Sequence, residues 1–445
     1  MHQYRQLIKI GTPIIIGQLG TIVLGFADTL MIGHHSTDEL AAAGLVNNVF
    51  GLVLLFYLGF SYGLTPIVGR LFGTGRKKEI GVKLKNSIPA NLLVGMLLMA
   101  AMTALYFNLD RIGQPVELLP IIRPYFMVNL ISIPFVGVFN TLKQFFDGTT
   151  RTAVPMWVMI GGNLLNILFN WLLIYGMCGF PELGLLGAGI STMGSRIAMA
   201  AALCVILLCG KANRIYRCGM REGRLNKSDF SEANRLGWPV ALQLGMETAA
   251  FSLSSIMVGW LGTTQLAAHQ VMITVSQLFY LILSGVAAAV SIRVSLFAGQ
   301  GNITAVRRTA ADGFRLNLLI SVVMSVPLLM LRSHIGMLFT DSAEVAQTVA
   351  VLCMVLTAYQ FGDGLQYTFA NALRGIACVK PMVLYAFIAY FVVNLPLGYL
   401  LGFTMKFGIT GIWAAFPFGL TAAGLLFWRR FRRELGKMET VGKTA

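Results

Sequence analysis

The chain has 445 residues, of which 56% are hydrophobic and only 12% are charged, and its formal net charge is +16. This balance lies well outside the usual range for a soluble globular protein and indicates an integral membrane protein. The positive charge requires no nucleic-acid partner, because basic loops beside anionic lipid headgroups account for it.

Apolar runs long enough to cross a bilayer as helices recur along the whole chain, bounded by glycine, proline or charge clusters. The first run follows MHQYRQLIKI, which lacks the small-residue cleavage pattern of a secretory signal, so we expect a permanent helix there. We predict an all-α membrane protein with twelve transmembrane helices, at approximately 10–33, 45–71, 88–107, 118–142, 154–178, 185–209, 236–261, 267–297, 314–331, 345–373, 382–403 and 409–428.

Lysine and arginine are distributed unevenly among the predicted loops. With twelve spans and an internal N-terminus, the inner side holds most of them, including the long basic connection 211–235 and Arg374. The outer side keeps only Arg111, Arg123, Arg332 and Lys406. The positive-inside rule therefore predicts that both termini are cytoplasmic, and we expect the protein in the bacterial inner (plasma) membrane.

Cysteine and histidine give no sign of a metal site. The six cysteines show no CxxC pairing, and the five histidines fall at or near the ends of the predicted spans. We interpret the cysteines as small packing residues and expect neither a disulfide framework nor a bound cofactor.

The sequence contains an internal duplication. A shift of 226 positions places Pro13 on Pro239 and Gly75 on Gly301 without a gap. Because both halves begin on the same side, we expect two six-helix bundles related by a pseudo-two-fold axis along the membrane normal, with a central cleft. The predicted domains are an N-lobe at 1–210, a basic cytoplasmic linker at 211–235, a C-lobe at 236–430 and a cytoplasmic tail at 431–445. Such a repeat favours a transporter, although channels and membrane enzymes also arise by duplication.

Polar side chains gather on two helices of the second half. Tyr359, Asp363 and Gln366 share one face of the tenth predicted helix, and Gln243 and Glu247 share a face of the seventh. An ionised group at bilayer depth normally faces a cavity or a partner, so the two acids are candidate functional residues. Carboxylates with a phenol and amides would form an oxygen-rich pocket, suited to Na⁺ at Glu247 and Asp363 or to proton uptake.

The first half carries a second polar set with a single charge. Gln18 and Asp28 lie on one face of the first helix, Asn166 and Asn170 on one face of the fifth, and Thr192 on the sixth. Amides such as Gln18 can simply cross-link helices. For Asp28, Glu247 and Asp363 a functional role is favoured. An amide would cross-link helices equally well and would avoid the free-energy cost of an ionised group inside the membrane.

Several motifs carry a family resemblance: GFADTLMIG followed by LAA, NILFNWLLIYG followed by GLLGAGIST, PVALQLGMETAAF, and YQFGDGLQ leading to ALRG. In this order they resemble the multidrug and toxic compound extrusion (MATE) family, in its bacterial NorM-type branch, over nearly the entire chain. The resemblance implies a C-lobe cation site at Glu247, Tyr359 and Asp363, and an N-lobe polar cluster at Asp28, Asn166, Asn170 and Thr192. Some relatives have a second acid where Asn170 stands, so this cluster has less charge to bind a cation.

The resemblance also implies a function. It indicates a secondary active antiporter that exports amphipathic, often cationic, drug-like compounds in exchange for Na⁺ or H⁺ by alternating access. We expect a monomer in contact with membrane lipids, without nucleic acid and without enzymatic chemistry. The chain has no Walker motif, so ATP is not expected to drive transport directly.

Two other classes remain open from the sequence. A flippase for lipid-linked saccharide precursors, as in related folds, would need cationic residues for a pyrophosphate headgroup. The clear intramembrane charges here are acidic, and Arg196 is the only basic residue well inside a predicted span. An intramembrane enzyme would need a nucleophile with a base, or a metal cluster, and neither pattern is present.

Overall fold

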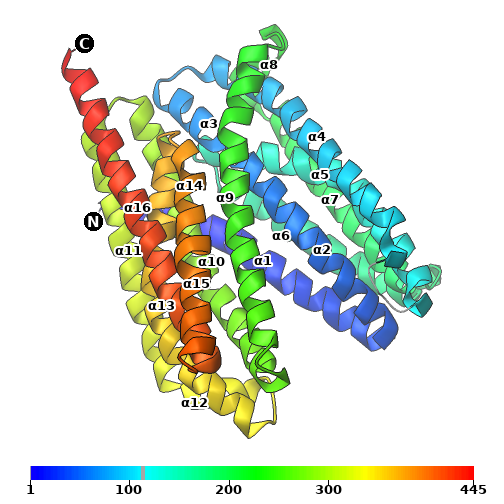
Figure 1. Ribbon diagram of the computed structural model, residues 1–445. Coiled ribbons are helices and arrows are strands. Elements are labelled where there is room, and N and C mark those ends of the chain that lie inside the picture. Colours follow the sequence, from blue (N-terminus) through cyan, green and yellow to red (C-terminus); the bar gives the residue numbers. More distant parts are fainter. Residues whose placement is uncertain (1, 112–115, 445) are drawn as a thin grey trace. The chain divides into compact units, whose positions relative to one another are not determined.

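The computed structural model describes residues 2–111 and 116–444, and it describes the side chains of 3–111 and 117–440. Met1, the segment 112–115 and Ala445, with which the predicted tail ends, lie outside the described residues. The described residues form helices joined by short turns and contain no strand (Figure 1). The helices are α1 (His2–His35), α2 (Thr37–Ser61), α3 (Leu64–Gly73), α4 (Lys77–Phe107), η1 (Leu109–Arg111), η2 (Val116–Leu118), α5 (Leu119–Gly148), α6 (Ala153–Ile174), η3 (Met177–Gly179), α7 (Gly184–Cys209), η4 (Lys211–Asn213), α8 (Arg214–Glu222), α9 (Lys227–Gly259), α10 (Thr263–Gly299), α11 (Ile303–Met330), α12 (Arg332–Ile335), η5 (Gly336–Leu338), α13 (Ala343–Gly375), α14 (Lys380–Phe387), η6 (Ile388–Asn394), α15 (Leu395–Tyr399), η7 (Leu400–Thr404) and α16 (Gly408–Thr444).

Within the described ranges, twelve helical segments are long and apolar enough to span a membrane. This confirms the predicted all-α class and the predicted number of spans. Most segments extend a few residues beyond the predicted apolar runs, because a helix continues into the polar residues that flank its apolar centre. The spans are Gln3–His35, Thr37–Gly73, Lys77–Phe107, Leu119–Gly148, Ala153–Ile174, Gly184–Cys209, Lys227–Gly259, Thr263–Gly299, Ile303–Met330, Ala343–Gly375, Lys380–Thr404 and Gly408–Thr440.

The apolar surface of these helices is exposed to an extent that is unusual for a soluble protein. On α11, Leu319 and Val323 are 59% and 60% exposed, and Met330 at its end is 76% exposed. Large exposed apolar patches indicate a contact with membrane or protein. Lipid would cover this face of α11.

Packing divides the chain into two compact units. We call Ile16–Ala241 the N-unit, and Met1–Ile15 together with Leu242–Ala445 the C-unit. The start of α1 therefore belongs to the C-unit and the start of α9 to the N-unit, and the two division points lie 226 residues apart. The predicted lobes, 1–210 and 236–430, differ from this division, because hydropathy marks where a span lies but not which helices its first turns pack against.

The duplication is visible in the backbone at equivalent turns. Gly75 follows α3 with φ +74°, and Gly301 follows α10 with φ +70°. In both turns the next backbone N–H donates to a carbonyl five residues back, that of Leu71 or Phe297, at 3.0 Å. Both positions need a left-handed backbone, which glycine adopts without a steric penalty. The aligned glycines thus have the same conformational role in each half.

The predicted linker, 211–235, is mostly helical and contains η4, α8 and the first turns of α9. Two glycines let α8 approach α4 closely. A Cβ at Gly81 would meet the backbone of Tyr216, and a Cβ at Gly219 would meet the backbone of Lys78, both closer than real Cβ contacts. This part of the connection is therefore packed against the N-unit.

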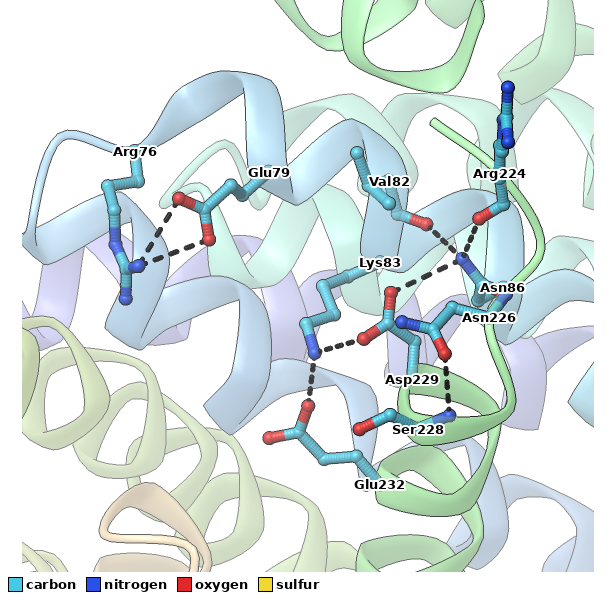
Figure 2. Close-up of polar contacts among 10 residues, drawn as sticks. All are labelled: Arg76, Glu79, Val82, Lys83, Asn86, Arg224, Asn226, Ser228, Asp229 and Glu232. Atoms are coloured by element: carbon cyan, nitrogen blue, oxygen red, sulfur yellow. Dashed lines mark hydrogen bonds and ion pairs between the residues drawn. The ribbon is translucent and has the colours of Figure 1, made fainter. Parts of the chain in front are cut away.

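Polar contacts fasten the beginning of α9 to α4 (Figure 2). The Lys83 Nζ atom lies 2.7 Å from Asp229 Oδ1 and 2.5 Å from Glu232 Oε2. The Asn86 Oδ1 atom accepts a hydrogen bond from the backbone N–H of Asn226 at 2.7 Å. These contacts explain why the first turns of α9 cluster with the N-unit.

The glycine contact between α4 and α8 predicts opposite effects for two glycine-to-alanine changes. We expect Gly219→Ala to lower the free energy of unfolding by about 1–3 kcal/mol, because the new methyl group overpacks the Lys78 backbone. The matched control, Gly436→Ala on α16, has open space at its Cβ and should stabilise the helix by about 0.5–1 kcal/mol. Thermal unfolding of both variants in detergent measures these changes in stability. Equal stabilisation by both substitutions would contradict the close contact between Gly219 and the Lys78 backbone.

Candidate functional site

The C-unit encloses a dense aromatic core around the tenth predicted span. Tyr359 of α13 lies 6.4 Å from Trp413 and 6.1 Å from Phe416, measured between ring centroids. Phe251 of α9 stacks on Phe416 at 4.8 Å with an interplanar angle of 14°. Tight packing of this kind fixes rotamers, so the polar groups on α9 and α13 are held in defined positions.

Glu247 of α9 is buried and accepts hydrogen bonds from three side chains. The Tyr367 hydroxyl donates to its Oε1 at 2.6 Å, and the amides of Gln243 and Gln366 donate to its Oε2 at 3.1 and 3.3 Å. A carboxylate is the form of the acid that accepts from several donors at once. The predicted supporting residues Gln243 and Gln366 thus contact the acid directly.

The structure extends this group to Arg374, which the sequence had suggested only as a charge at the inner end of a span. Arg374 is 5% exposed, and its guanidinium donates to Gln243 Oε1 at 2.6 Å. It attracts the Glu247 carboxylate electrostatically. A signal was present in the sequence, because a residue eleven positions after Asp363 lies on the same helix face.

Asp363 differs from Glu247 in its surroundings. It is 2% exposed, and the Glu247 carboxylate repels it. The predicted residues Glu247, Tyr359 and Asp363 are therefore close enough to interact within one buried group.

Tyr390 is a neighbour of this group that the sequence did not indicate. It lies on η6, a π-helical stretch that ends just before Pro396, and Leu395 N–H bonds back to the Tyr390 carbonyl. Proline supplies no N–H, and a π-turn lets the chain avoid the missing bond. Among the described residues, the buried Tyr390 hydroxyl and Gln366 Oε1 have no hydrogen-bond partner. Unpartnered buried oxygens next to two acids suit a bound cation or water.

The N-unit brings the predicted N-lobe cluster together. Asn170 of α6 donates to Asp28 Oδ1 of α1 at 2.5 Å. With its amide nitrogen turned toward Asp28, Asn166 donates to the same oxygen at 3.0 Å and accepts from the Thr192 hydroxyl of α7 at 3.2 Å. Residues of α1, α6 and α7 thus form one hydrogen-bonded group that contains the Asp28 carboxylate, and its role remains a prediction.

A basic side chain lies next to this cluster. Arg196 of α7 donates to Ser132 Oγ at 2.6 Å and to Asn129 Oδ1 at 3.3 Å. Its charge interacts with that of Asp28. The N-unit group therefore combines one acid with one guanidinium. The C-unit group has two acids, Glu247 and Asp363, and one guanidinium, that of Arg374.

The remaining predicted residue, Gln18, lies half-buried on α1. Nearby on the same helix, Gly20 faces the Asn163 amide of α6, which is 8% exposed. Amides at such a contact are typical of residues that join membrane helices. A supporting role for Gln18 stays a prediction.

Metal ligands of the transition-metal type do not gather in the described ranges. No group of three or more histidine, cysteine, aspartate or glutamate side chains there could hold a metal ion, and the six cysteines are free. The polar groups of both units are instead carboxylates, amides and hydroxyls, which suit hard cations.

Comparison with known proteins identifies the family to which this sequence and fold correspond. The sequence model of the MatE family matches residues 13–172 and 239–400, two segments whose starts are 226 residues apart. The multidrug resistance protein NorM of Aliivibrio fischeri is 32% identical over 438 residues, which cover 96% of this chain and 94% of the relative. NorM of Vibrio parahaemolyticus is 31% identical over 443 residues, with coverage of 97% and 96%.

Solved structures agree on the fold. An outward-facing structure of a multidrug resistance MATE family transporter has a TM-score of 0.88 at 17% identity and covers 98% of this chain and 97% of its own. A eukaryotic MATE transporter has a TM-score of 0.86 at 19% identity, with coverage of 98% of both chains. The protein is thus a multi-pass helical membrane protein with the fold of these transporters. It belongs to the multidrug and toxic compound extrusion family.

Proposed function

We propose that the protein is a secondary active multidrug efflux antiporter, which exports amphipathic, often cationic compounds in exchange for Na⁺ or H⁺. The observation that carries the proposal is the pair of buried acids, Glu247 and Asp363, in a group with unpartnered oxygens at Gln366 and Tyr390. Family membership and relatives called multidrug resistance proteins support the class of substrate. Exchange of this kind needs no covalent chemistry, so we assign no enzymatic activity.

The coupling follows from differential binding. A cation and a cationic drug can compete for the same carboxylates, or the ion can favour one of two conformations that open to opposite sides. Either route links inward ion flow to outward drug flow. No cofactor is required, and we propose that the protein works as a monomer.

We favour Na⁺ as the coupling ion. The buried acids offer carboxylate oxygens, and Gln366 Oε1 and the Tyr390 hydroxyl offer neutral ones, which together resemble the oxygen ligands of hard cations. We place the protein in a bacterial inner membrane with both termini in the cytoplasm, because basic residues concentrate on that side in the predicted topology.

Separate ion gradients test the coupling. We expect an inward Na⁺ gradient at equal internal and external pH to drive drug efflux from proteoliposomes, because Na⁺ entry is the proposed source of free energy. A pH gradient without Na⁺ is the control. Efflux driven by the pH gradient alone would reassign both acids to proton transfer, and transfer of a lipid-linked saccharide without drug efflux would favour a flippase.

A further inference from the structure

We propose that α8 and the first turn of α4 form a binding surface for the phosphate headgroups of anionic membrane lipids. We call it the α4–α8 surface, and it comprises residues 75–79 and 214–222, all of which belong to the N-unit. The inference goes beyond the proposed antiport function, because it concerns how the N-unit contacts the membrane and does not depend on the coupling ion.

A cavity of about 270 Å³ lies where α8 meets the beginning of α4. It is lined by Gly75, Arg76, Lys77, Lys78, Glu79 and Ile215. Three of these residues are cations and one is an acid. Drug-sized ligands occupy pockets of roughly 300–1,000 Å³, so this smaller cavity suits a single headgroup phosphate better than a drug.

The helix α8 combines a packed face with a basic and apolar outer surface. Tyr216 and Gly219 are buried, and a Cβ at Gly219 would meet the Lys78 backbone, so this face is turned toward α4. Ile215, by contrast, is 46% exposed. The arginines of α8 are exposed or half-buried, and they are Arg214, Arg217 and Arg221. Basic and apolar residues on a short amphipathic helix are typical of helices that lie in the headgroup layer.

The position of the cavity along the chain places it at the level of the headgroups. It lies at the turn between two segments that are long and apolar enough to span a membrane, Thr37–Gly73 and Lys77–Phe107. Both segments leave the hydrocarbon region at this turn. Lipid phosphates occupy the same level, whereas a free anion would have to bind from bulk water. The surface therefore favours a lipid as the source of the phosphate.

Two acids already pair with cations of this surface, but they do so at exposed positions. Arg76 Nη1 lies 3.2 Å from Glu79 Oε2, and Lys78 Nζ lies 3.4 Å from Glu222 Oε2. All four side chains are between 47% and 64% exposed. Exposed ion pairs contribute little net free energy, whereas a phosphate can accept two parallel hydrogen bonds from one guanidinium. A headgroup can thus replace these carboxylates as the partner.

The positive charge of the surface exceeds what its acids balance. Residues 76–79 and 214–222 contain six basic side chains and two acidic ones. Farther along α4, Lys83 lies against Asp229 and Glu232 of α9 and holds the linker within the N-unit (Figure 2). The excess of positive charge is therefore left at the start of α4 and on α8. Anionic headgroups complement this excess.

Native mass spectrometry of the purified protein with defined lipids tests the proposal. We expect the wild type to bind phosphatidylglycerol more tightly than phosphatidylcholine, which carries a cationic group beside the same phosphate. In Lys77→Gln/Lys78→Gln, the dissociation constant for phosphatidylglycerol should rise about fivefold for each charge removed, or roughly 25-fold in all. Both lysines are exposed, so the variant should fold normally.

The matched control is Arg307→Gln/Arg308→Gln, which removes two consecutive exposed cations from α11 of the C-unit. This variant should bind phosphatidylglycerol with nearly the wild-type dissociation constant. An equal loss of affinity in both double variants would show that the lipid responds only to total charge, and it would overturn the proposed surface. Equal affinity of the wild type for the two lipids would overturn it as well.

A photoreactive phosphatidylglycerol in phosphatidylcholine vesicles locates the contact. We expect cross-links at residues 75–79 and 214–222 of the wild type and a lower yield there in Lys77→Gln/Lys78→Gln. Inorganic phosphate at the concentration of the lipid should leave the yield unchanged. Competition by inorganic phosphate would overturn a lipid as the ligand, and cross-links confined to other helices would reject the α4–α8 surface.

Discussion

Asp363→Asn and Glu247→Gln should each reduce coupled drug export to the level of protein-free vesicles, with nearly unchanged expression and folding. Both changes keep side-chain size and hydrogen-bonding capacity but remove the charge, so they separate ionisation from packing. Glu247 accepts hydrogen bonds from Tyr367 and Gln243, and the Gln oxygen can partly retain them. Gradient-driven efflux from proteoliposomes and drug resistance of producing cells measure the effect.

The matched control for these variants is Asp312→Asn. Asp312 is also a buried acid of the C-unit, but it faces Arg308 and Arg315 instead of the candidate site. We expect transport to survive this change even if stability falls. Wild-type efflux in both site variants would reject the proposed site, and loss of transport in all three would indicate a general sensitivity to charge removal.

Asp28→Asn should impair export while equilibrium Na⁺ binding at Glu247 and Asp363 survives. Asp28 has amide partners in Asn166 and Asn170 and a nearby guanidinium in Arg196, so the N-unit group has little net charge with which to bind a cation. The amide variant would still form hydrogen bonds but would change how α1 contacts α6. A loss of transport without a loss of ion binding is the expected pattern.

Isothermal titration or ²²Na⁺ binding to the purified Asp28→Asn protein shows whether Na⁺ binding survives this change. Asp363→Asn is measured in parallel. The two units arose from one repeat, yet in the 226-residue alignment Asp28 falls on Ser254 and Glu247 falls on Thr21. Their acids therefore occupy different levels of equivalent helices. Loss of Na⁺ binding in Asp28→Asn with retention in Asp363→Asn would exchange the roles that we assign to the units.

Much of this architecture could be predicted from the sequence because it depends on short-range patterns. An apolar run of sufficient length forms a span in almost any context, so the twelve helices followed from hydropathy alone. The 226-residue repeat followed from aligned glycines and prolines, and the turns at Gly75 and Gly301 have the same backbone conformation. Helical periodicity also identified the polar faces, on which Asp28, Glu247 and Asp363 lie.

The tertiary structure alone decided which of these faces meet. Hydrogen bonds join α13 to α9 through Gln366, Tyr367 and Arg374, whose partners lie between 119 and 131 positions earlier in the sequence. Helical periodicity carries no information over such a separation. For that reason Arg374 could be counted as an inner-side charge by sequence and yet be a buried partner of Gln243. Likewise, composition does not reveal that the first turns of α1 and α9 belong to opposite units. Pairwise packing, which depends on side-chain shape across helices, determines both.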